Sequence, residues 1–159
     1  MPFRMQPAQF PHGGFPEGTE RAPGSSQTYP VGTPVTWDTA SQELNEHPLG
    51  TNVTNIVGVS LEAVVSGEST NPSGNVNFAK ATRSNVFIAV VTNGSGEVQD
   101  VTPDLVGNEY GLRKNGSGVS AWFSVNSADT TNVVVQVTGI DTERNIAYFK
   151  FIESAIQEI

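Results

Sequence analysis

The stretch NVVVQVTGIDTERNIAYFKFI, residues 132–152, decides the fold class. Apolar side chains recur at every second position in both of its halves, at Val133, Val135 and Val137 and then at Ala147, Phe149 and Phe151. A period of two is that of a β-strand with one buried face. The segment 139–145 between the halves is short enough to join neighbouring antiparallel strands. The stretch therefore predicts a β-hairpin.

The rest of the chain repeats this kind of pattern. Short runs rich in Val, Ile, Thr and aromatic residues alternate with clusters of Gly, Asn, Asp, Pro and Ser, which is typical of antiparallel strands joined by turns. We expect strands at 34–38, 55–66, 76–81, 86–92, 119–126, 132–140 and 145–152. Residues 102–106 and the last residues are each expected to make a single turn. The predicted fold is all-β, a small antiparallel β-barrel or β-sandwich with an extended N-terminal arm.

The chain length is accounted for by one folded body and one appendage. A chain of 159 residues with 36% hydrophobic residues can bury one modest core. Its 16 Gly and 10 Pro residues exceed ordinary usage without a collagen-like period, which favours turns and extended segments over helices. We expect residues 1–26 to form the Pro/Gly-rich arm and residues 27–159 to form the body.

The arm combines a stiff backbone with widely spaced aromatic side chains. Its frequent prolines disfavour helix and keep the segment extended. One interpretation is a disordered leader, because chain termini often fray. Disordered segments are poor in aromatic residues, however, whereas a segment that docks on a partner needs a few apolar anchors. We therefore expect the arm to bind a partner through Phe3, Arg4, Phe10, Phe15 and Arg21.

Net charge and the lack of cysteine exclude several classes of function. Lys and Arg total 8 against 16 Asp and Glu, so the net charge of −8 is expected to repel nucleic-acid phosphates. Without cysteine the chain has no disulfide, no thiolate nucleophile and no Cys-based metal site. No apolar run has the length of a signal peptide or a membrane span. We expect a soluble protein that binds neither nucleic acid nor membrane.

The reactive side chains match no catalytic motif. His12 and His47 have no partner at a metal-binding spacing, and we expect both in exposed loops. Asp100, Asp104 and Glu109 fall within one stretch, but their spacing is not that of a calcium-binding loop. We therefore expect no enzymatic activity, no catalytic residue, no cofactor and no metal.

Five segments carry a family resemblance. In chain order they are VGTPVTW (31–37), IVGVSLE (56–62), LVGNEYGL (105–112), DTTNVVV (129–135) and YFKFIESA (148–155). In their order, and in the size of the chain, they resemble the capsid decoration proteins of tailed phages, also called head auxiliary or cement proteins. The resemblance spans residues 31–155 and does not cover the arm.

The resemblance implies a small β-barrel or β-sandwich body that sits on the outer surface of a bacteriophage capsid. It also implies a homotrimer, or in some relatives a dimer, with no catalytic site. We accordingly expect a structural virion protein, made in the host cytoplasm, that binds the major capsid protein and neighbouring copies of itself. The role of the arm is inferred from its own residues, and its partner is either the capsid or a sister subunit.

Two alternatives to this function are a carbohydrate- or receptor-binding module and an acidic hydrolase. Trp37, Trp122 and Tyr110 would suit a carbohydrate- or receptor-binding β module displayed on a virion, since exposed aromatic rings stack on sugars. Core or subunit-interface positions are the alternative interpretation of both tryptophans. An acidic hydrolase is disfavoured, because no carboxylate pair has the surroundings that would separate two pKa values.

Overall fold

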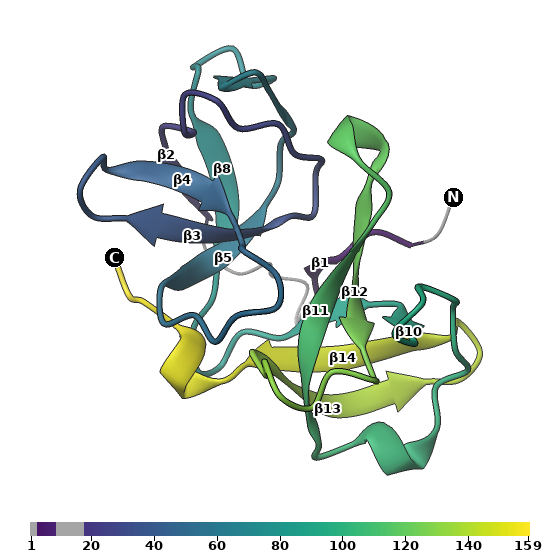
Figure 1. The fold of residues 1–159 in the computed structure, drawn as a ribbon. Coiled ribbons are helices and arrows are strands. Elements are labelled where there is room, and N and C mark those ends of the chain that lie inside the picture. Colours follow the sequence, from purple (N-terminus) through teal and green to yellow (C-terminus); the bar gives the residue numbers. More distant parts are fainter. Residues whose placement is uncertain (1–2, 9–17) are drawn as a thin grey trace.

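The computed structural model describes residues 3–8 and 18–159, and these residues are all-β (Figure 1). The described residues form strands and three short 3₁₀ turns, η1 (Pro103–Leu105), η2 (Gly118–Ser120) and η3 (Glu153–Ala155). The all-β part of the expected fold class is therefore confirmed. Within the described part of the chain, no helix is long and apolar enough to cross a membrane.

Two main sheets make up the described part of the chain. The seven-stranded sheet runs in the order β1 (Gln6–Pro7), β9 (Phe87–Ala89), β14 (Ile146–Phe151), β13 (Val135–Asp141), β11 (Glu109–Asn115), β12 (Trp122–Asn126) and β10 (Val91–Thr92). The five-stranded sheet runs in the order β2 (Gly18–Arg21), β8 (Val76–Lys80), β5 (Ile56–Ser60), β3 (Pro34–Asp38) and β4 (Glu43–Glu46). A small hairpin joins β6 (Val64–Val65) to β7 (Glu68–Ser69).

The hairpin predicted for residues 132–152 is present as β13 and β14. The two strands pair antiparallel from Val135 opposite Phe151 to Asp141 opposite Ile146. Side chains at alternate positions of β14, including Phe149, are buried as the period of two requires. Val133 differs from the prediction: it is only half-buried, and the fully buried residue is Val134, whose N–H donates to the carbonyl oxygen of Tyr110 at 3.0 Å.

Several other predicted strands need correction. The strand at 34–38 is β3, and the turn at 102–106 contains η1. The strand expected at 55–66 stops at Ser60, because the chain bends at Leu61 and continues as β6. The strand expected at 119–126 begins only at Trp122, after η2. Five strands were not predicted: β1, β2, β4, β7 and β11.

The seven-stranded sheet curls around the main core. β9 and β10 are separated in sequence by Val90 alone, yet β9 pairs with β14 and β10 pairs with β12. β10 and β12 run parallel over just two residue pairs, and no closed barrel is found among the residues described. Phe87, Phe149 and Phe151 fill the curl, with ring centroids 5.3–5.9 Å apart.

The main core continues into the five-stranded sheet. Ile56, Val59 and Ala79, from β5 and β8, belong to the same buried cluster as the phenylalanines. A second cluster around Tyr29 and Phe78 belongs to the five-stranded sheet itself. Because apolar burial is the main stabilising contribution, the shared cluster ties the two sheets together.

Candidate functional site

Two pieces of the N-terminal arm lie within the sheets of the body. β1 pairs antiparallel with β9, and Met5 beside it is 1% exposed in the main core. β2 pairs antiparallel with β8 at the edge of the five-stranded sheet. The described parts of the arm, expected to be a separate appendage, are thus paired with body strands. The intervening segment, with the predicted anchors Phe10 and Phe15, lies outside the described residues.

Arg4 connects the two halves of the molecule. Its guanidinium donates one hydrogen bond to the carbonyl oxygen of Val31, just before β3, and another to that of Val119 in η2, both at 3.3 Å. Val31 leads into the five-stranded sheet, whereas η2 joins β11 to β12 in the seven-stranded sheet. A guanidinium has five N–H donors, and within residues 3–8 and 18–159 Arg4 uses two of its nitrogens in these bonds.

Three exposed apolar residues adjoin this arginine, either in the chain or through its hydrogen bonds to their backbone. Phe3 and Val31 are each 38% exposed and Val119 is 44% exposed, although all three are large hydrophobic residues. Phe3 is the chain neighbour of Arg4, and the two valines supply the carbonyl oxygens that Arg4 binds. We call Phe3, Arg4, Val31 and Val119 the Arg4 patch. Exposed apolar side chains gathered in one place indicate a contact surface.

A glycine beside each valine shapes the patch. Gly32 has a φ of +82°, and a Cβ at this position would lie 2.5 Å from the carbonyl oxygen of Met5. Gly118 has a φ of +60° next to Val119. Both backbone conformations favour glycine, and the lack of a side chain at Gly32 lets the arm pass directly over the turn. The turns therefore hold Val31 and Val119 beside the arm.

Arg21, the fifth predicted anchor, lies elsewhere. Its guanidinium stacks over the ring of Trp37, with 5.6 Å between its central carbon and the ring centroid, and it donates to the backbone carbonyl of Glu20 at 2.8 Å. Sequence reasoning thus found two members of the Arg4 patch, Phe3 and Arg4. It missed Val31 and Val119, whose sequence signal is a valine next to a turn glycine.

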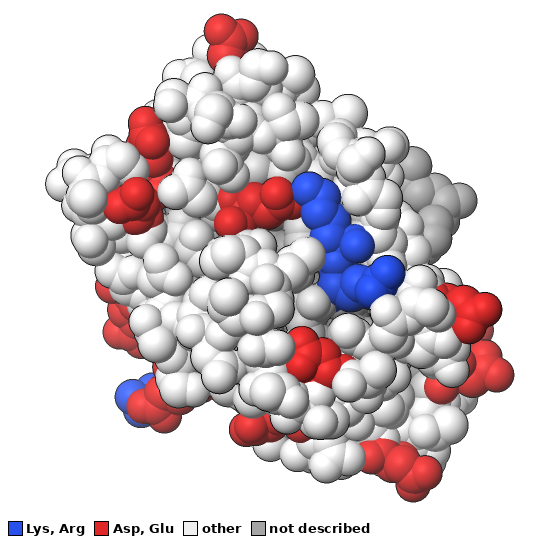
Figure 2. All heavy atoms as spheres, in the orientation of Figure 1, with Lys and Arg blue, Asp and Glu red and all other residues white. Residues whose placement is uncertain are grey.

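An ion pair gives a second connection between the sheets. The ammonium of Lys114 in β11 lies 2.6 Å from the carboxylate of Glu46 in β4, and the side chains are only 20% and 23% exposed. Its neighbour Arg113 donates to the carbonyl oxygen of Gly94 at 2.6 Å. Figure 2 shows basic side chains gathered over β11, on a face where the other charged side chains are mostly acidic.

His47, expected in an exposed loop, is 3% exposed. Its N–H donates to the carbonyl oxygen of Pro34 at 2.9 Å, so the chain stays against β3 after β4 ends. Within the described residues, its ring Nδ1 has no hydrogen-bond partner. Burial lowers the pKa of the imidazole to about 4. The hydroxyl of Tyr29 also has no partner in this part of the chain, and burial raises its pKa.

The aromatic residues considered for sugar binding do not form one platform. Tyr110 is 7% exposed, and Trp37 lies under Arg21 in the five-stranded sheet. Trp122 is half-buried in β12, where it pairs with Asn115 at the other end of β11 from Tyr110. Among the described residues, no group of three His, Cys, Asp or Glu side chains is placed to hold a metal ion.

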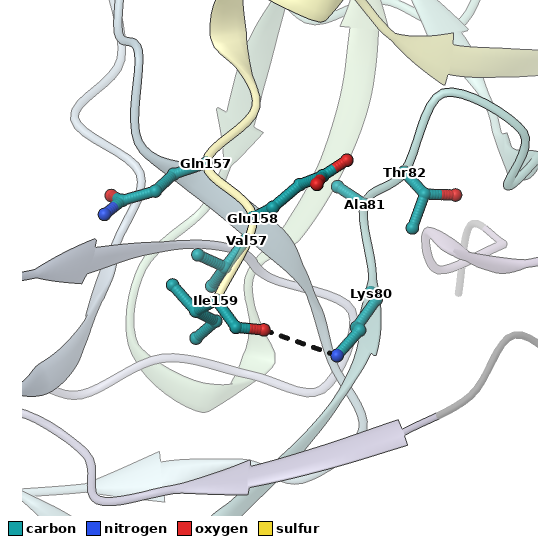
Figure 3. Close-up of a pocket in the computed structure, with 7 residues that line it drawn as sticks. All are labelled: Val57, Lys80, Ala81, Thr82, Gln157, Glu158 and Ile159. Atoms are coloured by element: carbon teal, nitrogen blue, oxygen red, sulfur yellow. Dashed lines mark hydrogen bonds between the residues drawn. The ribbon is translucent and has the colours of Figure 1, made fainter.

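Small surface hollows add no reactive cluster to the described residues. Figure 3 shows one of about 260 Å³ lined by Lys80 and by the C-terminal residues 157–159. The ammonium of Lys80 donates to the carbonyl oxygen of Ile159 at 3.4 Å, across the hollow. Two further hollows share the exposed ion pair between Arg83 and Glu153. The Arg4 patch is therefore the candidate functional site.

Comparison with family models, curated proteins and solved structures gives no match to this chain.

Proposed function

We propose that this chain is a structural virion protein that decorates and stabilises the outer surface of a tailed-phage capsid. The observation that carries the proposal is the Arg4 patch, where three exposed apolar residues adjoin one arginine on a protein of net charge −8. The ordered resemblance of residues 31–155 to capsid decoration proteins supports the same function. The partners are the major capsid protein and neighbouring copies of the chain, as a homotrimer or a dimer, and the protein performs no catalysis.

The physical logic favours a small rigid body with modest contacts. Contacts repeated over a symmetric lattice become strong together, because each bound copy raises the effective concentration of the next contact. In this proposal the curled seven-stranded sheet is the small barrel-like part of the body. The paired arm segments brace the patch, because Met5 is buried directly beside Arg4. A braced patch loses little conformational entropy when it docks.

The test is sedimentation of the full chain with capsids that lack a decoration protein. The protein should pellet with the capsids, saturate at a fixed number of copies per capsid and raise the temperature at which they rupture. A protein that stays in the supernatant at every concentration and leaves the rupture temperature unchanged contradicts the proposal. An unrelated acidic β protein of similar size serves as the control for trapping in the pellet.

A further inference from the structure

A second surface of the chain complements the Arg4 patch. Val98 is the most exposed of the large hydrophobic residues described, at 49%, and Glu97 and Asp100 beside it are also exposed. We call Glu97, Val98 and Asp100 the acidic edge. The Arg4 patch is apolar with one cation, and the acidic edge is apolar with two anions.

The acidic edge lies beside β10, the last strand of the seven-stranded sheet. Gln99 N–H donates to the carbonyl oxygen of Val91 at 2.9 Å, and Asn93 N–H donates to that of Glu97 at 3.0 Å. Residues 97–99 therefore run along the outer side of β10. Exposed edges of this kind pair readily with other chains, and flanking carboxylates restrict the partner to a basic or neutral surface.

We propose that the Arg4 patch of one copy docks on the acidic edge of a second copy. Val98 of the second copy packs against Phe3 and the exposed valines of the patch, and a carboxylate of its edge accepts a hydrogen bond from the guanidinium of Arg4. Two edges placed against each other would bring carboxylates together, which is unfavourable. The Arg4 patch carries a positive charge, opposite to that of the acidic edge. It is therefore the surface on which the edge docks.

Geometry favours this edge over the other exposed acidic and apolar segment. Asp104, Val106 and Glu109 are also exposed, but they lie at or before the start of β11, whereas the Arg4 patch lies beyond its end. A strand of this length spans about 24 Å. The acidic edge lies beside the pair formed by β11 and β12. Arg113, near the end of β11, donates a hydrogen bond to the carbonyl oxygen of Gly94, in the loop between β10 and the edge. Figure 1 shows β10 and the dark purple arm segment that contains β1 in the same half of the molecule.

Patch and edge on one side of the molecule allow a two-fold contact. Each copy then contributes both halves, so the same pairing forms twice. An interface of ordinary size covers about 800 Å² per partner, roughly 30 Å across, which accommodates both pairings. The inference rests on the proposed function in one respect, since self-contacts suit a shell subunit, but it is tested in solution without capsids.

The experiment measures the mass of the full chain by sedimentation equilibrium over a wide concentration range. The wild-type protein should associate reversibly. Arg4→Glu alone, and Glu97→Lys with Asp100→Lys alone, should each weaken association about tenfold or more, since each places like charges in the contact. An equimolar mixture of the two variants should associate again, because each patch then meets an edge of opposite charge. A wild-type protein that stays monomeric throughout, or a mixture that fails to associate, overturns the proposal.

Arg4→Glu also removes two hydrogen bonds that join the sheets. A second pair of variants therefore tests the contact with Arg4 left in place. Val98→Asp changes an exposed side chain at the edge and should abolish association while circular dichroism and the melting temperature are unchanged. Val106→Asp is the matched control, a valine of similar exposure (43% against 49%) beside acidic residues, and should associate like the wild-type protein. Equal association of the two variants contradicts the docking. Because no capsid is present, this result is separate from the outcome of capsid sedimentation.

Discussion

The ammonium of Lys114 lies 2.6 Å from the carboxylate of Glu46, so β11 of one sheet is ion-paired to the edge strand β4 of the other. The pair is mostly shielded from water, and losing one partner leaves a half-buried charge uncompensated. Lys114→Met should therefore lower the free energy of unfolding by about 1–2 kcal/mol. Urea denaturation measures this change.

Arg144→Met is the control for Lys114→Met. Arg144 lies 3.7 Å from Asp141, and its side chain is 73% exposed. An exposed pair in water contributes little, so this variant should unfold like the wild-type protein. Equal stability of the Lys114 and Arg144 variants would show that the inter-sheet pair contributes nothing to the fold.

Gly32 should tolerate no side chain. Its φ of +82° disfavours any L-residue, and a Cβ would meet the carbonyl oxygen of Met5 at 2.5 Å. Gly74 has nearly the same φ, +78°, but no atom of the described residues lies within 4 Å of an added Cβ. Gly74→Ala should cost about 1 kcal/mol from backbone strain alone, and Gly32→Ala about 3 kcal/mol or more in urea denaturation. Equal losses would mean that the arm does not pass over Gly32.

His47 should make the protein less stable in acid. Burial lowers the pKa of its imidazole from the ordinary 6.5 to about 4, so the unfolded chain takes up this proton at a higher pH than the folded chain does. The contribution of the neutral His47 imidazole to the free energy of unfolding is complete above about pH 6.5. It is lost as the pH falls from about 6.5 to about 4. The loss is about 1.4 kcal/mol per pH unit and about 3 kcal/mol in total.

The His47 prediction is checked with His47→Leu. Carboxylates also titrate in this range, so the measured quantity is the difference between wild-type and variant stability as a function of pH. The wild-type protein should lose more stability than His47→Leu between about pH 7 and about pH 4.5. Parallel curves for the two proteins would show that the ring is exposed to water.

The sequence predicts the hairpin of β13 and β14 because apolar residues recur at every second position, at Val135 and Val137 in one strand and at Ala147, Phe149 and Phe151 in the other. β11 escaped prediction for the opposite reason: Arg113 and Lys114 are consecutive and charged, and Gly111 interrupts the alternation. Its charges are satisfied by partners far along the chain, Glu46 and the carbonyl oxygen of Gly94. A local pattern carries no information on such partners.

The candidate site shows the same limit. Phe3 and Arg4 stand out in the sequence as an aromatic residue and a cation in a proline-rich segment. Val31 and Val119 do not, because their link to Arg4 spans 27 and 115 positions of the chain. Only the folded chain shows which turns the arm crosses.

The most direct test of the central claim compares two exposed apolar residues in capsid binding. Phe3 in the Arg4 patch is 38% exposed and Leu49 outside it is 37% exposed, so Phe3→Ser and Leu49→Ser remove similar surface. Sedimentation with undecorated capsids at several protein concentrations gives the occupancy of each variant. We predict that Phe3→Ser lowers the occupancy and flattens the binding curve while Leu49→Ser binds like the wild-type protein. Identical binding by all three proteins would contradict the claim that the Arg4 patch is a contact surface.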